Sequence, residues 1–308
     1  MTAPAIEPIR AALADRGADA FVHAGSPSDP GLDYLRARGS PTVDAGSTIA
    51  AAVTPDAEFA LAADADRHPA ERLAVALCDR GLSGTLLAPP SIPHDAALYL
   101  EGAGFELASS DALDRARAIK TAAAVERIER AQAAASAGLD RAASVLAGAT
   151  VEDGRLHRDG APLTAERLRR LADVAVVESG AVPAGSTRVE TVGSPAEPRP
   201  PANGDGATGP DEPLRSGEPL VLELAPREPS GYRAGLVRTL VPGTDGGWER
   251  RAHVAVESAL RSARTMLAAD GATVDAVETE LEAEVRSFGF GRGASGSVHG
   301  VGLEARER

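Results

Sequence analysis

The sequence predicts an α/β protein with two domains, and three observations carry this prediction. Residues 1–115 alternate between helix-like and strand-like segments, which is typical of a mixed sheet covered by helices. Residues 116–147 carry apolar side chains at helical spacing, and residues 218–243 form two strand-like runs around a turn. A chain of 308 residues also has the length of about two domains. We therefore expect a domain over 1–115 and a second over 116–308.

Helix and strand signals are expected to alternate along the first domain. A helix over 5–16 ends at Gly17, and a buried strand begins at Phe21. A hairpin is predicted around Thr54, Pro55 and Asp56, because strand-like runs lie on both sides of this turn. A helix over 69–80, ending at Gly81, and a strand over 85–90 follow. The pattern therefore predicts a sheet with helices packed against it.

The second domain begins with one long predicted helix. Its apolar face repeats every three or four residues from 116 to 147: Val125, Ile128, Gln132, Ala135, Leu139, Ala142 and Leu146. Thr164 is expected to cap the next helix. The Pro- and Gly-rich residues 193–217 predict a surface loop. A hairpin over 218–243 with its turn at Pro229–Gly231, helices over 249–269 and 273–287, and a terminal strand over 296–308 complete the prediction.

Composition restricts the environment and the partners. The net charge of −13 argues against nucleic acid and anionic membranes as partners. Lys120 is the only lysine among 32 basic residues, and this arginine usage together with the acid excess indicates a halophilic source. No apolar run reaches ~20 residues, and Glu7 and Arg10 interrupt the N-terminus, so we expect a cytoplasmic protein. Cys78 is the only cysteine, which excludes a disulfide framework.

Two residues are candidates for chemistry. His299 lies in a glycine-rich segment, but it has no second histidine at metal-ligand spacing. Glu223 lies between Leu222 and Leu224, so it either faces solvent or is partly buried and then needs a cation, a metal or a proton. An ion pair with Arg238 across the hairpin is a purely structural alternative. These residues alone do not decide among the alternatives.

Four segments, taken in order, resemble the pita-bread metallopeptidases of the creatinase, Xaa-Pro aminopeptidase and prolidase branch. They are RAIKTAAAVERIERAQ from Arg117, LRSGEPLVLELAPR from Leu214, SGYRAGLVRT from Ser230, and VHGVGLEARE from Val298. The resemblance implies a creatinase-type N-terminal α/β domain and a C-terminal pita-bread domain. It also implies hydrolysis by two divalent ions, which two Asp, one His and two Glu hold in that family.

Few of these ligands have a counterpart in this chain. Glu223 takes the place of the first aspartate and His299 that of the histidine, so both are candidate vestigial metal ligands. Gly235 stands where the second aspartate is expected, and Arg306 where the family has a substrate-contacting histidine. The strands that carry the two glutamates would follow Arg308, so the pita-bread domain is expected to lack its last strands. Glu304 and Glu307 are the alternative carboxylates in the last segment.

The resemblance leaves three functional hypotheses. The first is a catalytically inactive family member with no metal, or with weakly bound divalent metal, that binds a peptide and forms a homodimer. The second is an active or weakly active Xaa-Pro peptidase that uses Mn, Co or Zn with substitute ligands or ligands from a partner chain. The third is a truncated product of a decayed gene. The absence of Asp at position 235 favours the first.

Overall fold

The chain folds into two compact units, which are described separately because each has its own core. The computed structural model describes residues 5–36, 48–62, 67–192, 211–243, 246–269, 271–291 and 298–307. The first unit comprises residues 1–127, 302–304 and 308, and the second comprises residues 128–301 and 305–307. The structure confirms the α/β class, since helices and sheets occur in both units.

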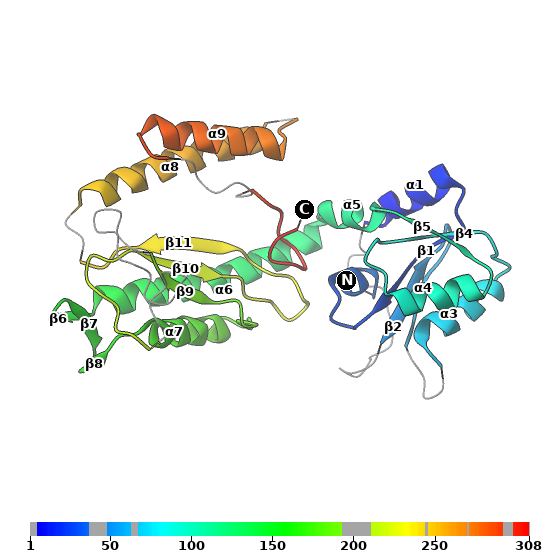
Figure 1. Cartoon of the computed structure of the whole chain (residues 1–308), viewed down its shortest axis with the longest axis horizontal. Helices are drawn as coiled ribbons and strands as arrows, with labels where there is room; N and C mark the ends of the chain where they lie inside the picture. Colours follow the sequence, from blue (N-terminus) through cyan, green and yellow to red (C-terminus); the bar gives the residue numbers. More distant parts are fainter. Residues whose placement is uncertain are drawn as a thin grey trace. The chain divides into compact units, whose positions relative to one another are not determined.

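A five-stranded mixed sheet forms the centre of the first unit (Figure 1). Its strand order is β3 (Glu58–Ala62), β2 (Ile49–Val53), β1 (Ala20–Gly25), β4 (Thr85–Ala88) and β5 (Glu106–Ser109). The first three strands pair antiparallel, as the predicted hairpin around Pro55 requires, whereas β4 and β5 run parallel to β1. The predicted strands at Phe21 and at 85–90 are confirmed.

Helices cover both faces of this sheet. One core contains Ala20 and Val22 of β1 together with residues of α3 (Pro69–Cys78) and α4 (His94–Gly102). The remaining helices are α1 (Glu7–Arg16), α2 (Pro30–Arg36) and α5 (Ala112–Ala118). Phe21 lies between Ala20 and Val22 in β1, so its side chain points to the opposite face of the sheet. It is fully buried there too. Because this central strand is buried on both sides, apolar residues occupy consecutive positions from Ala20 to Val22.

A partly buried polar pair, buried His23 with half-buried Asp29, lies where β1 meets α2. His23 is 3% exposed, and its Nε2 lies 3.0 Å from Oδ1 of Asp29. The backbone N–H of Leu32 donates to the same oxygen over 2.9 Å. Burial acts to raise the pKa of Asp29, but the hydrogen bonds from His23 and from the backbone outweigh it and hold the pKa below its ordinary value. The carboxylate of Asp29 therefore joins the strand to the first turn of the helix.

Because the pKa of Asp29 is lowered on folding, the free energy of unfolding depends on pH in the acid range. The contribution of Asp29 is fully present above the unfolded carboxyl pKa of about 3.9 and is lost as the pH falls through the lower folded value. We expect the stability gap between the wild type and Asp29→Asn to be constant at neutral pH and to narrow below about pH 4. Urea unfolding of both proteins across this range measures the gap. A gap that widens in acid would contradict the assignment.

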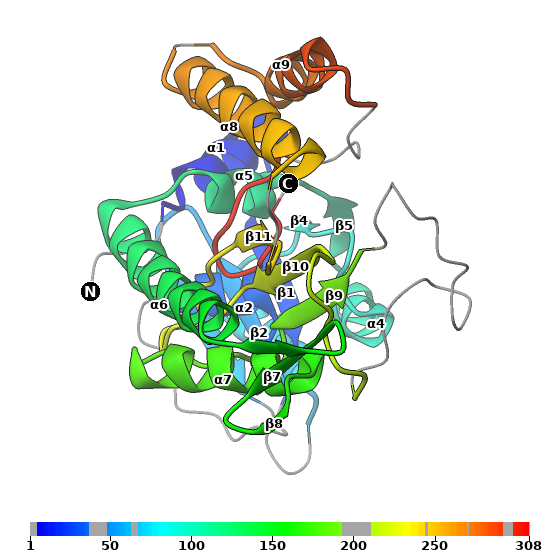
Figure 2. The ribbon, with the colours of Figure 1, turned by 90° about the vertical axis from the view of Figure 1, so that its left-hand side faces the viewer.

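In the second unit, two helices pack against one side of a three-stranded antiparallel sheet (Figures 1 and 2). The helices are α6 (Ala122–Ala147) and α7 (Ala165–Glu178), and the strand order is β11 (Leu236–Leu240), β10 (Leu220–Leu224) and β9 (Arg188–Thr191). As predicted, Thr164 caps α7, its Oγ1 accepting a hydrogen bond from the N–H of Arg167 over 3.1 Å. The hairpin of 218–243 is confirmed as β10 and β11.

The long helix differs from the prediction at its start. The single helix expected from 116 is divided into α5 and α6, because residues 119–121 between them are not helical. Ala135, Ala142 and Leu146 lie in the core as predicted, whereas Val125 is largely exposed. The face of α6 buried against the sheet and α7 is rich in alanine, and Gly138 contacts both. A Cβ there would be 3.0 Å from side-chain atoms of both Leu224 and Val176, so only glycine fits without displacing a neighbour.

Two smaller elements complete the second unit. A three-stranded sheet is formed by β6 (Thr150–Glu152), β7 (Arg155–Arg158) and β8 (Ala161–Pro162), which the sequence did not predict. The predicted pair of later helices is confirmed as α8 (Trp248–Leu267) and α9 (Val274–Ser287). The expected surface loop of 193–217 lies largely outside the described residues. None of the described helices is long and apolar enough to cross a membrane.

Candidate functional site

The two faces of the β9–β10–β11 sheet have opposite character. Leu220, Leu222 and Leu224 of β10 are fully buried and belong to the core formed with α6 and α7. Val221 and Glu223 alternate with them and are only partly buried. The period of two along a strand therefore places Glu223 on the face that α6 and α7 do not cover. The candidate site is this open face.

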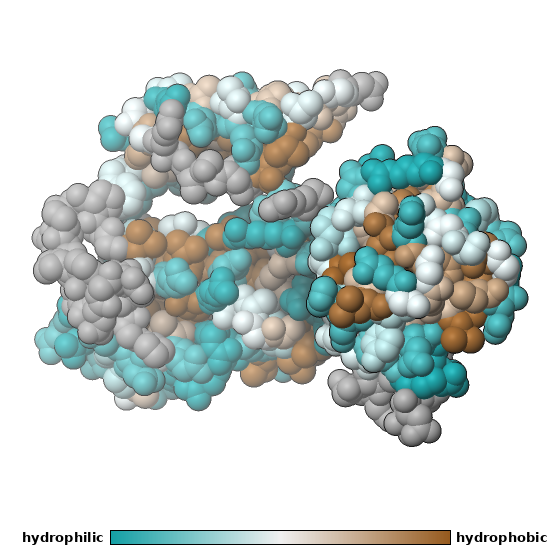
Figure 3. All heavy atoms as spheres, turned by 45° about the vertical axis from the view of Figure 1, so that its right-hand side comes forward, coloured by the Kyte–Doolittle hydropathy of each residue, from teal (hydrophilic) through white to brown (hydrophobic). Residues whose placement is uncertain are grey.

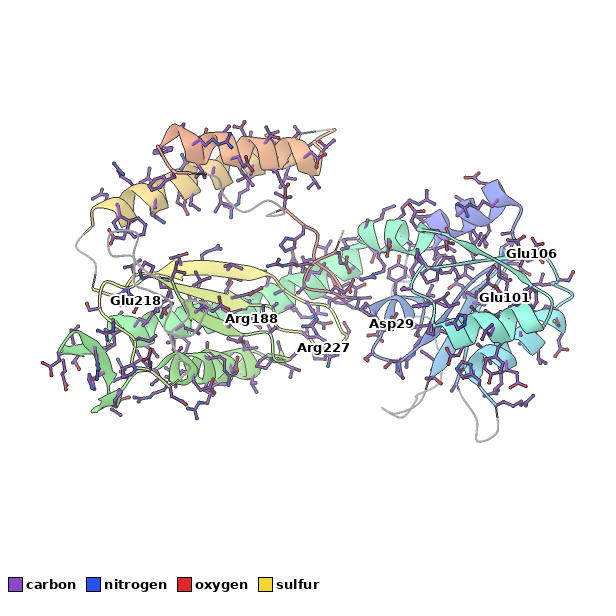
Figure 4. All side chains as sticks on the ribbon, viewed as in Figure 1. Asp29, Glu101, Glu106, Arg188, Glu218 and Arg227 are labelled. Carbon is purple, nitrogen blue, oxygen red and sulfur yellow. The ribbon has the colours of Figure 1, made fainter. Side chains whose placement is uncertain are left out.

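Glu223 lies between two guanidinium groups. Its Oε2 is 3.4 Å from Nη1 of Arg188, and its Oε1 is 3.7 Å from Nη2 of Arg306. Arg188, labelled on β9 in Figure 4, is the direct cross-strand neighbour of Glu223 in the β9–β10 register. Arg306 comes from the last segment of the chain. The side chain of Glu223 is 27% exposed, and those of both arginines are 65% exposed. The carboxylate thus has cationic partners from two segments far apart in sequence.

The predicted alternative pair of Glu223 with Arg238 is wrong. The β10–β11 register places Arg238 opposite Leu222, whereas Val237 lies opposite Glu223. Directly paired residues share a face of the sheet, so Arg238 belongs to the other face. Its Nη1 donates to the carbonyl oxygen of Val237 over 2.8 Å instead.

Position 235 offers no ligand. Gly235 directly precedes β11, and a Cβ built on it would have one neighbour within 4 Å, the carbonyl oxygen of Ala305 at 3.8 Å. A side chain at this position would therefore meet little obstruction. The described residues around position 235 therefore do not require glycine there.

The last segment is not the strand that the sequence predicts. Over its described part, residues 298–307, it forms a turn closed by a bridge between Gly300 and Glu307. The segment contains three glycines in the run from Gly296 to Gly302, and no named strand of the described residues pairs with it. His299 is exposed at the start of this turn.

Neither alternative carboxylate takes over a ligand position. Oε2 of Glu304 lies 2.7 Å from Nη2 of Arg117, whose side chain is largely buried. Glu307 is buried, 8% exposed, and its backbone pairs with Gly300. Among the described residues, no three His, Cys, Asp or Glu side chains are grouped so that they could hold a metal ion.

These residues do not fit a dinuclear metal centre. Two divalent ions in one pocket repel each other unless several carboxylates neutralise them. The open face offers Glu223 with two guanidiniums beside it, and glycine at the second position. Sequence reasoning found Glu223 and Arg306, but it missed Arg188. The signal that could have revealed Arg188 is its place in a short strand-like run, RVET, which pairs with the strand of Glu223.

Comparisons with known proteins agree on one family and one fold. Residues 126–308 match the model of metallopeptidase family M24. The chain resembles the prolidase from Pyrococcus horikoshii OT3, with 18% identity, 98% of this chain and 83% of that chain covered, and a TM-score of 0.72. The Xaa-Pro dipeptidase from Bacillus anthracis gives 14% identity, coverages of 98% and 82%, and a TM-score of 0.72.

A third similar structure is the dipeptidase PepE from Mycobacterium ulcerans. It has 21% identity, coverages of 98% and 81%, and a TM-score of 0.66. At these identities the likeness establishes the fold. The sequence matches none of the curated proteins.

Proposed function

The chain belongs to metallopeptidase family M24, and from this premise we propose that it is a non-catalytic member that keeps the prolidase-like fold to bind a peptide. The single observation that carries the proposal is the arrangement of Glu223 between Arg188 and Arg306. The two guanidiniums make the potential at this carboxylate less negative, and a divalent ion would have to compete with them for its oxygens.

The two other family positions support the same conclusion. Gly235 has no side chain that could bind a metal, and His299 is exposed at the start of a turn. One imidazole and one partly neutralised carboxylate would hold at most a single, weakly bound Mn, Co or Zn ion. Such an ion lacks the second metal on which dinuclear hydrolysis depends. Glu223 and His299 are therefore proposed as vestigial ligands.

Metal analysis and an activity assay on one sample test this proposal. We expect purified protein that has been incubated with Mn, Co or Zn and then desalted to retain fewer than two ions per chain, and to leave Xaa-Pro dipeptides uncleaved. EDTA should leave its melting temperature unchanged. The assay is run in dilute and in molar salt. Two retained ions per chain, or cleavage that EDTA abolishes, would contradict the proposal.

A gain-of-ligand variant provides the matched control. The triple variant Glu223→Asp, Gly235→Asp and Arg306→His restores three family positions at once and removes one guanidinium. We expect it to bind more metal than the wild type, because two carboxylates then share the open face. A single Gly235→Asp change should bind less metal than the triple variant, since Arg306 still pairs with Glu223.

We further propose that the protein works in a salt-rich cytoplasm. The acid excess and the nearly exclusive use of arginine support this setting. Molar salt screens charge repulsion to within about 3 Å. The midpoint of urea unfolding should therefore rise from dilute buffer to molar KCl; a midpoint that falls would argue against it.

A further inference from the structure

Two arginines lie directly opposite each other where the β10–β11 hairpin continues beyond its named strands. Arg227 and Arg233 form an antiparallel bridge in the same register that pairs Glu223 with Val237. The backbone hydrogen bonds join the residues on either side of this pair and not the two arginines themselves. In an antiparallel sheet such a pair has Cβ atoms about 4.5–5.5 Å apart. Both guanidiniums can therefore reach one common ligand group.

Both arginines belong to the open face of the sheet. Residues two apart along a strand share a face, so Arg227 lies on the same side as Ala225 and Glu223. Arg233 lies there too, because directly paired residues share a face. Arg227 is exposed, and Figure 4 labels it past the end of β10. Arg233 is half-buried, and its Nη1 donates to the carbonyl oxygen of Ala225 over 3.3 Å.

The direct sheet neighbours of this pair on the open face carry no charge. They are Ala225 and Gly235 on one side, and Arg227 is also bridged to Val182, which is 48% exposed. The carboxylate nearest in sequence, Glu228, lies on the opposite face, where its Oε1 accepts hydrogen bonds from N–H groups of the turn. Among the described residues, Arg227 has no carboxylate partner. The guanidinium of Arg227 is thus available to a ligand.

The open face is cationic, although the whole chain carries a net charge of −13. Its charged side chains are four arginines and two glutamates: Arg188, Arg227, Arg233, Arg306, Glu190 and Glu223. Glu223 is held between two of these arginines, and Glu190 lies two residues further along β9. In the last segment, Glu304 pairs with an arginine of α5, and Glu307 is buried. The excess of arginine favours an anionic ligand.

Apolar side chains lie on the same face as the arginine pair. Val237 of β11 is 49% exposed, and Val182 is exposed to the same degree beside Arg227. Figure 3 shows hydrophobic residues, in brown, on the second unit beneath the α8–α9 hairpin, with hydrophilic residues in teal next to them. Because exposed valines lie on both sides of the pair, the chain of a ligand can continue past the arginines in both directions. An acidic side chain within a peptide fits this surface better than a terminal carboxylate does.

On the premise of the proposed peptide binding, we propose that Arg227 and Arg233 together hold the carboxylate of an acidic side chain within the bound peptide. Guanidiniums bind carboxylates through hydrogen bonds of about 2.7–2.9 Å. Such contacts lie within the ~3 Å over which charges still interact in molar salt, so the site suits a salt-rich cytoplasm. A bound carboxylate also offsets the repulsion between two like charges that lie directly opposite each other. The open face therefore selects acidic peptides.

Calorimetric titration of the full chain with three octapeptides in dilute salt tests the ligand class. The first has acetylated and amidated ends and one central glutamate, and the second has glutamine at that position. The third has the glutamine and a free C-terminal carboxylate. We expect the first to bind on the order of 10-fold more tightly than the other two. Equal binding of the first and second peptides, or a third that binds as tightly as the first, would overturn the proposal.

Two arginine variants test the location of the site. Arg227→Gln should remove most of the preference for the glutamate peptide, because one guanidinium of the pair is lost. The matched control is Arg238→Gln, which changes an exposed arginine on the opposite face of the same sheet and should leave the preference unchanged. Circular dichroism checks that both variants remain folded. If both variants lower the preference alike, the carboxylate is not held by this pair and the proposal fails.

The titrations separate this proposal from the proposed function on which it rests. A chain that binds the glutamate and glutamine peptides equally keeps the proposed peptide binding and loses only the preference for acidic ligands. A chain that binds none of the three peptides contradicts both proposals. Two retained metal ions per chain contradict the non-catalytic role, whatever the peptide preference.

Discussion

Replacing Leu222 by alanine should cost the second unit about 2–5 kcal/mol of unfolding free energy. Leu222 is 1% exposed at the centre of β10 and packs in the core with α6 and α7. Removing its branched end leaves a cavity that the strand cannot close, because β9 and β11 hold β10 from both sides. Urea unfolding, followed by hydrogen exchange of the peptides from β10, measures this loss in the unit that contains it.

The adjacent residue is the control for this change. Val221 lies one position earlier in the same strand, but it points to the open face and is only partly buried. Val221→Ala should therefore cost less than about 1 kcal/mol. If both variants lose the same stability, the open face of the sheet is covered after all, and Glu223 does not lie on an accessible surface. This comparison thus also tests the geometry of the candidate site.

The sequence predicted the individual helices and strands better than it predicted which of them pair with one another. The helix after Thr164 and the β10–β11 hairpin were found from periodicity and turn residues, because both signals are local. The last segment was predicted as a strand from its composition, yet a strand needs a neighbour to pair with. The named sheets of the described residues leave it none. Pairing is a property of the whole fold and not of the segment.

The candidate site shows the same limit at the level of single residues. The run LVLEL fixes the alternation of β10, but it does not fix which face is buried, so both environments of Glu223 stayed open. The choice between Arg238 and Arg188 as a partner depends on strand register, which the hairpin sequence left undetermined. The approach of Arg306 depends on the path of the last segment. Long-range contacts therefore decided every interaction of this carboxylate.

Glu228, unlike Glu223, is a buried carboxylate, and it holds the turn between β10 and β11. It is 4% exposed, and its Oε1 accepts hydrogen bonds from the N–H groups of Ser230 and Tyr232 over 2.9 Å and 3.2 Å. The hydroxyl of Ser230 donates to the same oxygen. Oε2 lies 3.7 Å from Nη2 of Arg130 on α6. The turn was predicted from Pro229 to Gly231, but this carboxylate was not recognised as its anchor.

Glu228→Ala should cost about 2–3 kcal/mol, because it leaves donors of the turn without an acceptor in a partly buried place. Glu228→Gln keeps an acceptor oxygen and should cost about half as much. Arg130→Ala should cost less than about 1 kcal/mol, since the side chain of Arg130 is 59% exposed. Urea unfolding of the three variants measures and ranks these losses of unfolding free energy. If Arg130→Ala proves as costly as Glu228→Ala, the ion pair to α6 anchors the turn, and the hydrogen bonds from Ser230 and Tyr232 contribute little.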